Sequence, residues 1–283
     1  MKILSYGLDQ RMEPRLAFFL RGHVVDVMRA SLWMKEDRGA QDFLNLASSM
    51  RLALEDWGRS YRLLKELEEA FLSVELEGLS VYKRPISLPE TEVVFFAPIP
   101  DPPSLRHFNA FGENPISHFA FGNTQTLLGH RQALTVNGLA PQGEVAAIIA
   151  RDKQNGPASI AGYCTVNNWQ DVSQTGGLAI GKVTGLGPWM VTADEVESHK
   201  LGTGLSLDMQ LRLNGQVQQE GRFNKMSHGF ADMLQIASET GVQAGDVLCS
   251  GSPINAEKAS AYKSGDTIEL ELQALGALST SIN

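Results

Sequence analysis

Prolines crowd into one short stretch of this sequence and constrain how the chain can be divided. Residues 82–104 contain Pro85, Pro89, Pro98, Pro100, Pro102 and Pro103. Because proline fixes φ and removes a backbone donor, a run of this density interrupts regular helix and strand. We therefore expect a boundary here, with a small N-terminal domain over residues 1–95 and a larger C-terminal domain over residues 96–283.

The residues before the prolines have the patterns of a hairpin followed by helix. Residues 16–27 form two apolar runs around Arg21-Gly22, which is a hairpin signal. From residue 42 to residue 71 the apolar residues recur at every third or fourth position, with Lys and Glu on the other side. This spacing predicts helix.

The residues after the prolines have mainly strand patterns. Residues 205–213 alternate between apolar and polar side chains, and Asn214-Gly215 then supplies a type I′ turn signal. Ser227 is the expected N-cap of a short helix, and the acids in residues 266–276 alternate with apolar residues. We therefore predict a mainly β (α+β) fold with a few helices.

The charge and hydropathy of the chain argue against several classes of protein. The 283 residues have a net charge of -8 and no run of Lys and Arg, which argues against binding to nucleic acid or to an anionic membrane. No segment reaches the ~18 apolar residues of a membrane helix, and the first residues do not resemble a signal peptide. Cys164 and Cys249 lie in strand-like runs, as buried thiols of a reducing compartment would. We expect a cytoplasmic protein.

Eight motifs follow one another through the second part of the chain. They are EVAAIIARD, AGYCTVNN, GGLAIGK, GLGPWMVTADEV, LRLNGQV, SHGFADMLQIASE, AGDVLCSGSP and SGDTIELELQALG, preceded by PSLRHFNAFGENP and FAFGNTQTLLGH. In this order and approximate spacing, over residues 98–283, they resemble the fumarylacetoacetate hydrolase family. A single motif of this kind is weak, whereas eight in register favour the fold of that family.

The resemblance implies a fold, a class of substrate and a metal site. The family has a mixed β-sandwich roll, is usually dimeric, and cleaves or rearranges small 2-oxo or 1,3-dicarbonyl acids. Its active members hold Mg²⁺, Mn²⁺ or Ca²⁺ with a Glu-x-Glu pair and a later Asp. The metal stabilises the enolate that develops as a carbon–carbon bond breaks. By resemblance we expect a homodimer with a small-molecule substrate.

The positions that match the family's acidic and basic residues are mostly changed in this chain. The Glu-x-Glu pair falls on Gln142 and Glu144, and the later Asp falls on Asn168. A further Asp of the fully developed hydrolases falls on His107, and their water-activating histidine falls on Asn114.

These replacements weaken the case for a metal cofactor. The amides of Gln142 and Asn168 are neutral donors, and Mg²⁺ keeps its waters unless carboxylates compensate. Glu144 is therefore a weak metal ligand or none, and we expect no cofactor in the protein as isolated. Mg²⁺ or Mn²⁺ would bind only together with a chelating substrate. Asn114 cannot accept a proton near neutral pH, so it cannot replace the histidine base.

The candidate catalytic residues each have a simpler interpretation as well. Glu144 is a pocket acid or a solvated strand end, and His107 is a base, a soft-metal ligand or a surface residue. His118 is the nearest replacement for the missing base or a polar loop residue. Lys182, which matches the family's lysine, binds a substrate carboxylate or is an exposed turn residue. The expected substrate-binding residues are Gln142, Asn168, Asn114, Asn109 and Ser252.

Three functions remain open from the sequence. The first is a family enzyme with a degenerate metal site that performs hydrolysis, decarboxylation or related enolate chemistry on a small 2-oxo or 1,3-dicarbonyl acid. The second is a metal-independent lyase, isomerase or cyclase of a biosynthetic pathway, and the third is a catalytically silent ligand-binding relative. The sequence has no nucleophile elbow, no Rossmann spacing, and no close His/Cys pair for zinc.

Overall fold

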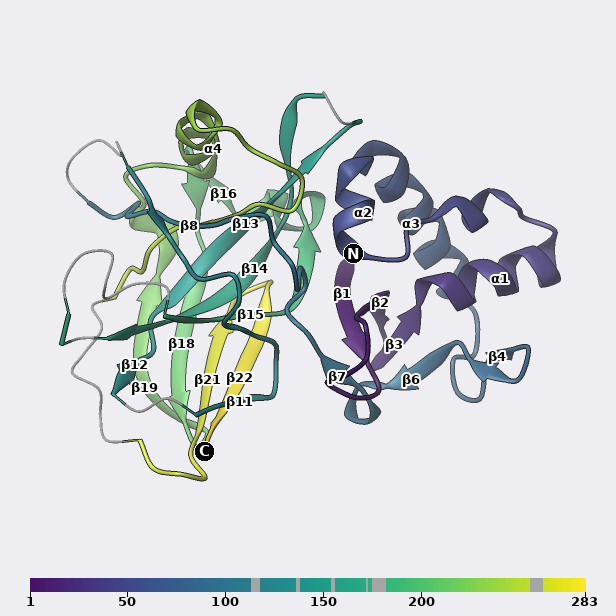
Figure 1. The fold of residues 1–283 in the computed structure, drawn as a ribbon, viewed down its shortest axis with the longest axis horizontal. Coiled ribbons are helices and arrows are strands. Elements are labelled where there is room, and N and C mark those ends of the chain that lie inside the picture. The colour runs from purple at the N-terminus through teal and green to yellow at the C-terminus, as the bar shows by residue number, and fades with distance from the viewer. Residues whose placement is uncertain (113–117, 136–137, 154–155, 172, 175–181, 255–261) are drawn as a thin grey trace.

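A computed structural model describes residues 1–112, 118–135, 138–153, 156–171, 173–174, 182–254 and 262–283. The described helices are α1 (Val27–Arg38), α2 (Met50–Glu55), α3 (Trp57–Phe71) and α4 (Phe230–Glu239), with short 3-10 helices η1 (Asp42–Asn45), η2 (Glu90–Glu92), η4 (Ala193–His199) and η5 (Phe223–Lys225). The remaining regular structure is strand, which confirms the predicted mainly β fold (Figure 1).

The larger sheet runs through the whole molecule. Its strands follow the order β6-β3-β2-β1-β15-β14-β13-β20-β8-β9, and β7, β10 and β12 pair at its sides. Their bounds are β1 (Lys2–Gly7), β2 (Arg15–Leu20), β3 (His23–Asp26), β6 (Ser87–Pro89), β7 (Val94–Phe95), β8 (Leu105–His107), β9 (Ala120–Phe121), β10 (Leu127–Leu128), β12 (Leu139–Ala140), β13 (Gly143–Arg151), β14 (Ala158–Asp171), β15 (Val183–Thr192) and β20 (Val247–Cys249).

A smaller sheet packs against the larger one. It follows the order β11-β22-β21-β18-β19, with bounds β11 (Gln132–Leu134), β18 (Asp208–Leu213), β19 (Gln216–Arg222), β21 (Thr267–Leu272) and β22 (Gly276–Ile282). Val145 and Ala147 of the larger sheet share one core with Met209 and Leu270 of the smaller one. Two short pairs complete the strands, β4 (Ser80–Val81) with β5 (Arg84–Pro85) and β16 (Lys200–Leu201) with β17 (Gly204–Leu205).

The hydrophobic core is continuous across the division expected at the prolines. Figure 1 shows the N-terminal helices beside the β-rich part, and strand β1 pairs with β15 through Ile3 and Met190. Leu63 and Leu64 of α3 belong to the same buried cluster as Ala146 and Ile148 of β13. The two parts therefore do not have separate cores, and a boundary between residues 95 and 96 stays a proposal about folding units.

The turn signals of the sequence are found where they were expected. Arg21 and Gly22 both have positive φ (49° and 78°) between β2 and β3, and so do Asn214 and Gly215 (51° and 79°) between β18 and β19. Positive φ at both central residues is the geometry of a type I′ turn, which favours Asn and Gly. Both hairpin predictions are confirmed.

The helix predictions need three corrections. The helical pattern over residues 42–71 is divided into η1, α2 and α3. The backbone is extended at Leu46 and Ser49, between η1 and α2, and non-helical at Asp56 (φ -136°, ψ 62°), between α2 and α3. Helix α1 was not predicted. Ser227 does not cap α4, since its hydroxyl is directed to the carbonyl oxygens of Ala110 and Gly112, at 2.8 and 2.7 Å, and can donate its hydrogen to either of them. The backbone N–H of Gly229 is held by the carboxylate of Asp232 at 2.9 Å.

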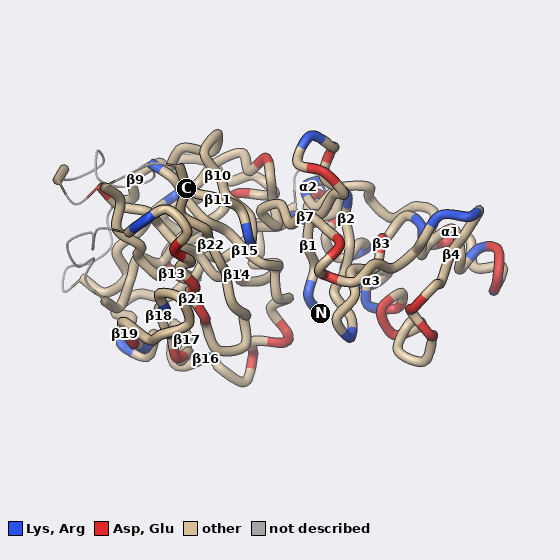
Figure 2. The backbone as a smooth tube through the Cα atoms, turned by 90° about the horizontal axis from the view of Figure 1, so that it is seen from below, with Lys and Arg blue, Asp and Glu red and all other residues tan. Residues whose placement is uncertain are grey.

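Charged residues of both signs are mixed along the backbone of both parts (Figure 2). Among the described residues, no helix combines the length and the apolar character needed to cross a membrane.

Candidate active site

Three strands of the larger sheet bring the candidate residues together. Strand β13 pairs with β20, where Ala146 lies opposite Cys249. Strand β20 in turn pairs in parallel with β8, where Cys249 lies opposite His107. Glu144 is two residues before Ala146 on β13, so its side chain is on the same face of the sheet as Ala146. The register therefore directs Glu144, His107 and Cys249 into one small region.

Glu144 is a buried carboxylate whose two oxygens are both held. It is 1% exposed, and its Oε1 accepts a hydrogen bond from Asn168 Nδ2 at 2.8 Å. Its Oε2 accepts from the backbone N–H of Gly251 at 3.1 Å. A buried charge is tolerated only when it is hydrogen-bonded or paired. The bond to Asn168 also supports the register of the motifs, which placed these two residues in one pocket.

His107 is the ionisable neighbour of Glu144. Its Nδ1 is 3.6 Å from Glu144 Oε2, and the residue is 4% exposed. Neither ring nitrogen has a hydrogen-bond partner within the described part of the chain. Buried polar atoms without a partner are rare in folded proteins and often mark a site of chemistry or binding. His107 is therefore placed to exchange a proton or to bind a ligand.

Cys249 is a residue of this region that the sequence interpretation missed. It is fully buried, and His107, Glu144 and Cys249 each offer one ligand atom within 4.8 Å of the other two. Burial raises the pKa of the Cys249 thiol well above its usual value, and the charge of Glu144 adds to the effect. His107 and Cys249 are far apart in the sequence, and the pairing of β8 with β20 brings them together across the sheet.

A cavity of about 480 Å³ opens above this region. Of the expected site residues, Glu144, His107, Gln142, Asn168, Asn109 and Ser252 line it, together with Phe108, Phe111, Gln170, Gly251, Pro253 and Ile254. Polar and aromatic side chains share the lining, as in a site for a small organic molecule.

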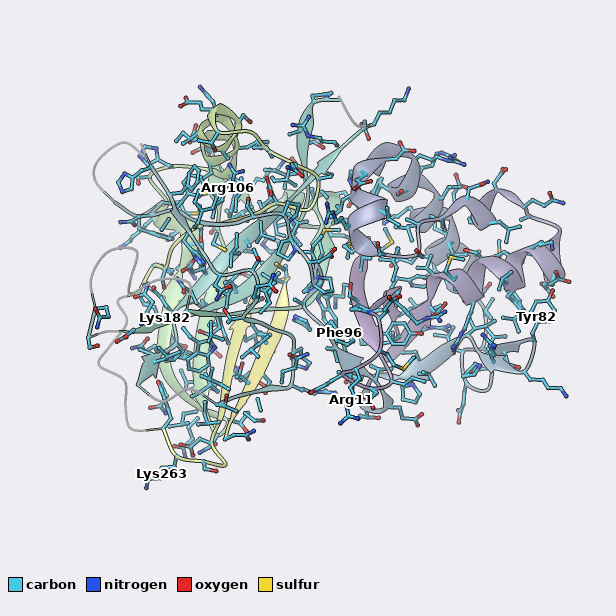
Figure 3. The ribbon with its side chains drawn as sticks, viewed as in Figure 1. Arg11, Tyr82, Phe96, Arg106, Lys182 and Lys263 are labelled. Carbon is cyan, nitrogen blue, oxygen red and sulfur yellow. The ribbon has the colours of Figure 1, made fainter. Side chains whose placement is uncertain are left out.

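Three of the expected site residues are not part of the described cavity lining. Lys182 is exposed on the side of the β-rich part away from the N-terminal helices, where its Nζ pairs with Asp171 at 3.0 Å (Figure 3). Hydrogen bonds from Ser173 and Lys182 lower the pKa of Asp171. His118 is also exposed, and Asn114 lies outside the described residues. The expectation that Lys182 lines the pocket is therefore corrected.

Arg106 fixes the strand that carries His107. Its guanidinium donates to the carbonyl oxygens of Ala237 and Gly241, at 2.8 and 2.6 Å, and to the carboxylate of Asp246 at 3.2 Å. The same group lies over the ring of Phe119 at 5.1 Å from its centroid. These contacts join β8 to the end of α4 and to the residues before β20, so Arg106 positions His107 without lining the cavity.

The donor set around Glu144 does not fit the hard divalent cation that the resemblance implies. Hard cations such as Mg²⁺ need several oxygen ligands, most of them anionic. Here Glu144 is the one carboxylate that lines the described cavity, and Asn168 directs its amide nitrogen to it rather than its oxygen. Among the described His, Cys, Asp and Glu side chains, those placed to share an ion with Glu144 are His107, through an imidazole nitrogen, and Cys249, through its thiol sulfur.

The C-terminal part of the chain, more than half of its residues, matches a known family. Residues 105–283 match the family described as "Fumarylacetoacetate (FAA) hydrolase C-terminal". Maleylpyruvate hydrolase of Aquipseudomonas alcaligenes is 29% identical over 150 residues, which cover 49% of this chain and 49% of that protein. Oxaloacetate tautomerase of Bacillus subtilis is 23% identical over 229 residues, or 68% of this chain and 74% of that protein. The chain spans about half the length of the first curated relatives that it matches.

Solved structures share the fold over the whole chain. Maleylpyruvate hydrolase from Sphingobium sp. SYK-6 is 18% identical with a TM-score of 0.69, covering 100% of this chain and 99% of that one, and it has also been solved with manganese(II) and pyruvate. A 2-keto-3-deoxy-D-arabinonate dehydratase complexed with magnesium and 2,5-dioxopentanoate is 19% identical with a TM-score of 0.65, covering 100% and 99%. Because the match includes more than half of its residues, the chain belongs to the fumarylacetoacetate hydrolase family.

Proposed function

We propose that the protein is an enzyme that transfers a proton on a small 2-oxo or 1,3-dicarbonyl acid and thereby forms its enol or enolate, without a hard metal ion. One observation carries this proposal. The buried carboxylate of Glu144 lies 3.6 Å from the buried imidazole of His107, whose ring nitrogens have no hydrogen-bond partner in the described residues, and both line the cavity.

The pair can perform the reaction without creating net charge in a buried place. Glu144 Oε2 accepts the proton from the carbon beside the carbonyl group, and protonated His107 donates a proton to the carbonyl oxygen. The carbon loses one proton, the oxygen gains one, and the pair is neutral overall before and after the step. Transfer of the proton from Glu144 back to His107 restores the starting state. Such acid–base catalysis contributes roughly 10²–10⁴-fold to a rate.

The rest of the lining suits the oxygens of such a substrate. Gln142, Asn109 and Ser252 offer amide and hydroxyl groups, and within the described lining no Lys or Arg is present. Neutral donors can hydrogen-bond to a carboxylate or oxo group, while protonated His107 supplies the positive charge. The proposal assigns substrate binding to these residues and to Asn168, which also orients Glu144.

The named relatives support this class of substrate. Maleylpyruvate, oxaloacetate and 2-keto-3-deoxy-D-arabinonate are all 2-oxo acids. The relatives named after them are a hydrolase, a tautomerase and a dehydratase. Hydrolysis requires a base that activates water, and the matching position here is Asn114. Proton transfer, as in a tautomerase, isomerase or lyase, is therefore better supported than hydrolysis. The open cavity favours an enzyme over a relative with a filled pocket.

We further infer that the protein is a cytoplasmic homodimer and that Mg²⁺ or Mn²⁺ binds only beside a chelating substrate. The family resemblance supports the dimer. The single carboxylate supports the metal dependence, because a substrate's own carboxylate and oxo group would supply the missing oxygens.

Exchange of substrate hydrogen with solvent tests the proposed proton transfer before the product is known. The protein is incubated in D₂O with small 2-oxo acids, beginning with pyruvate and oxaloacetate, and proton NMR follows loss of the hydrogens next to the oxo group. We expect exchange above the uncatalysed rate in the presence of a chelator. Glu144→Gln should lower it by about 10²–10⁴-fold, whereas the exposed control Glu239→Gln should not change it. Exchange that is equally fast in Glu144→Gln would refute the role of this carboxylate.

A further inference from the structure

We propose that His107, Glu144 and Cys249 form a binding site for a borderline divalent metal ion of the zinc class, with the open coordination position facing the cavity. The ligand set combines an imidazole nitrogen, a carboxylate oxygen and a thiolate sulfur. This combination suits Zn²⁺ or Co²⁺ far better than Mg²⁺, Mn²⁺ or Ca²⁺.

The distances are close to those of a tetrahedral site. Ligands at ~2.0–2.3 Å from a zinc ion lie roughly 3.3–3.8 Å from one another. The Nδ1 atom of His107 and Oε2 of Glu144 are already 3.6 Å apart, and all three ligand atoms lie within 4.8 Å of one another. The sulfur of Cys249 needs to approach the other two ligand atoms by at most about an ångström, which side-chain rotation on fixed strands can supply.

The unsatisfied ring nitrogens of His107 point independently to a ligand. His107 is only 4% exposed, and both of its ring nitrogens lack a hydrogen-bond partner in the described residues. An imidazole that only filled the core would leave two polar atoms unsatisfied at a substantial energetic cost. Coordination through Nδ1 would remove one of these unsatisfied atoms.

The surroundings of the three residues are those of a supported metal site. Asn168 and the backbone N–H of Gly251 hold the two oxygens of Glu144, which fixes the orientation of the carboxylate. Such outer contacts are usual around metal ligands. Cys249 and His107 lie opposite each other on paired strands, so their spacing is set by the sheet. Three protein ligands leave one coordination position of a tetrahedral ion open to water or a small ligand.

Metal binding goes beyond the proposed proton transfer. Because the ion would occupy Glu144 and His107, which transfer the proton, we expect the metal-bound form to be inactive in exchange and the metal-free form to be active. Binding is therefore measured without substrate. A protein that takes up the metal but shows no exchange after a chelator has removed it would refute the proposed function alone, and exchange activity without any metal uptake would refute the metal site alone.

Cobalt is the probe, because its absorption reports the ligands directly. Tag-free full-length protein is treated with a chelator, dialysed under reducing conditions and titrated with Co²⁺. We expect one Co²⁺ per chain, a thiolate-to-cobalt charge-transfer band in the near ultraviolet and the visible bands of four-coordinate Co²⁺. Zn²⁺ should displace the bound Co²⁺, and Mg²⁺ in large excess should not. Stoichiometric uptake without the charge-transfer band, or no uptake, would overturn the proposal.

The two buried cysteines provide a matched pair of variants. Cys164 and Cys249 both lie opposite Ala146, on the two strands that flank β13. Cys249→Ser should abolish the charge-transfer band and weaken Zn²⁺ binding by more than ~100-fold, the upper range for loss of an outer contact. Cys164→Ser should retain both. Equal Zn²⁺ affinity in the two variants would contradict the assignment, and the spectrum of the unsubstituted protein decides the matter if Cys249→Ser does not fold.

Discussion

Replacing Asn168 by aspartate tests the geometry on which the candidate site depends. The substitution places a second carboxyl group where Asn168 Nδ2 now donates to Glu144 Oε1 at 2.8 Å. Two full charges at that separation repel by about 6 kcal/mol at an effective dielectric constant of 20. Protonating an ordinary aspartate at pH 7 costs only about 4 kcal/mol. The cheaper outcome prevails, so the new group takes up a proton and the folded state loses about 4 kcal/mol.

The pH dependence of this loss follows from the sign of the change. The substitution raises the pKa of the new carboxyl group in the folded protein above its unfolded value, so the penalty grows as the pH rises. The gap in unfolding free energy between the natural protein and Asn168→Asp should therefore shrink from about 4 kcal/mol at pH 7 to about 1.5 kcal/mol at pH 5. Urea denaturation at the two pH values measures this gap. An equal gap at both pH values would show that the two side chains are not in contact.

Added Mg²⁺ provides the second arm of the same experiment. Two adjacent carboxylates can share a hard cation, so Mg²⁺ should restore stability to Asn168→Asp at pH 7. The effect should be larger in the double variant Gln142→Glu with Asn168→Asp, whose affinity for Mg²⁺ should exceed that of the natural protein by several tenfold steps. Asn167→Asp is the matched control. Asn167 Oδ1 already accepts from the backbone N–H of Gln142 at 3.0 Å, and as the residue before Asn168 on β14 its side chain is on the opposite face of the sheet. Micromolar binding of Mg²⁺ by the natural protein in titration calorimetry would refute the reasoning.

Three further predictions concern stability and assembly. Burial, with Arg131 nearby, lowers the pKa of His130 to about 4, below its value in the unfolded chain. The unfolded chain therefore binds the proton first as the pH is lowered, and the free energy of unfolding decreases by about 2 kcal/mol between pH 7 and pH 5. Urea unfolding of His130→Gln should lack this decrease. Leu64→Ala should lower the free energy of unfolding by about 2–5 kcal/mol. Because the core around Leu64 continues into β13, all probes should report the same single unfolding transition, whereas two separate transitions would favour independent domains. Light scattering at micromolar concentration should give the mass of a dimer, and a monomer would contradict the proposed assembly.

Local signals in the sequence predicted the turns well and the helices less well. Asn214 and Gly215 form a type I′ turn because only a few residues tolerate positive φ, so the signal survives without tertiary information. Helix α1 was missed although Asp26 accepts from the N–H of Arg29 and Gly39 ends the helix with a φ of 68°. Its buried residues, Val27, Ala30, Ser31 and Met34, follow helical spacing, but Ser31 is polar and the apolar Leu32 and Trp33 lie outside that stripe. The pattern of apolar residues therefore gave little sign of the helix. Caps would have been the better indicator.

The candidate site was predictable as far as motifs in register could reach. Glu144, Gln142 and Asn168 belong to segments that pair as neighbouring strands, and their common cavity follows from that register. Cys249 could not be found in this way, because it meets His107 only through the parallel pairing of β20 with β8, two segments far apart in the sequence. Lys182 was expected in the cavity because it matches the family's lysine, but it is exposed and pairs with Asp171 outside the cavity lining.

The pairing of β1 with β15 bears on any attempt to shorten this protein. Strand β10 covers the first part of β15, near Thr184, and β1 covers the last part, near Met190 and Val191. A fragment that starts at residue 96 would uncover this last part and leave a row of backbone groups open. Such an edge recruits strands from other molecules. We expect the fragment to self-associate and precipitate, so that an apparent loss of activity on truncation would report aggregation rather than a catalytic role of the N-terminal residues.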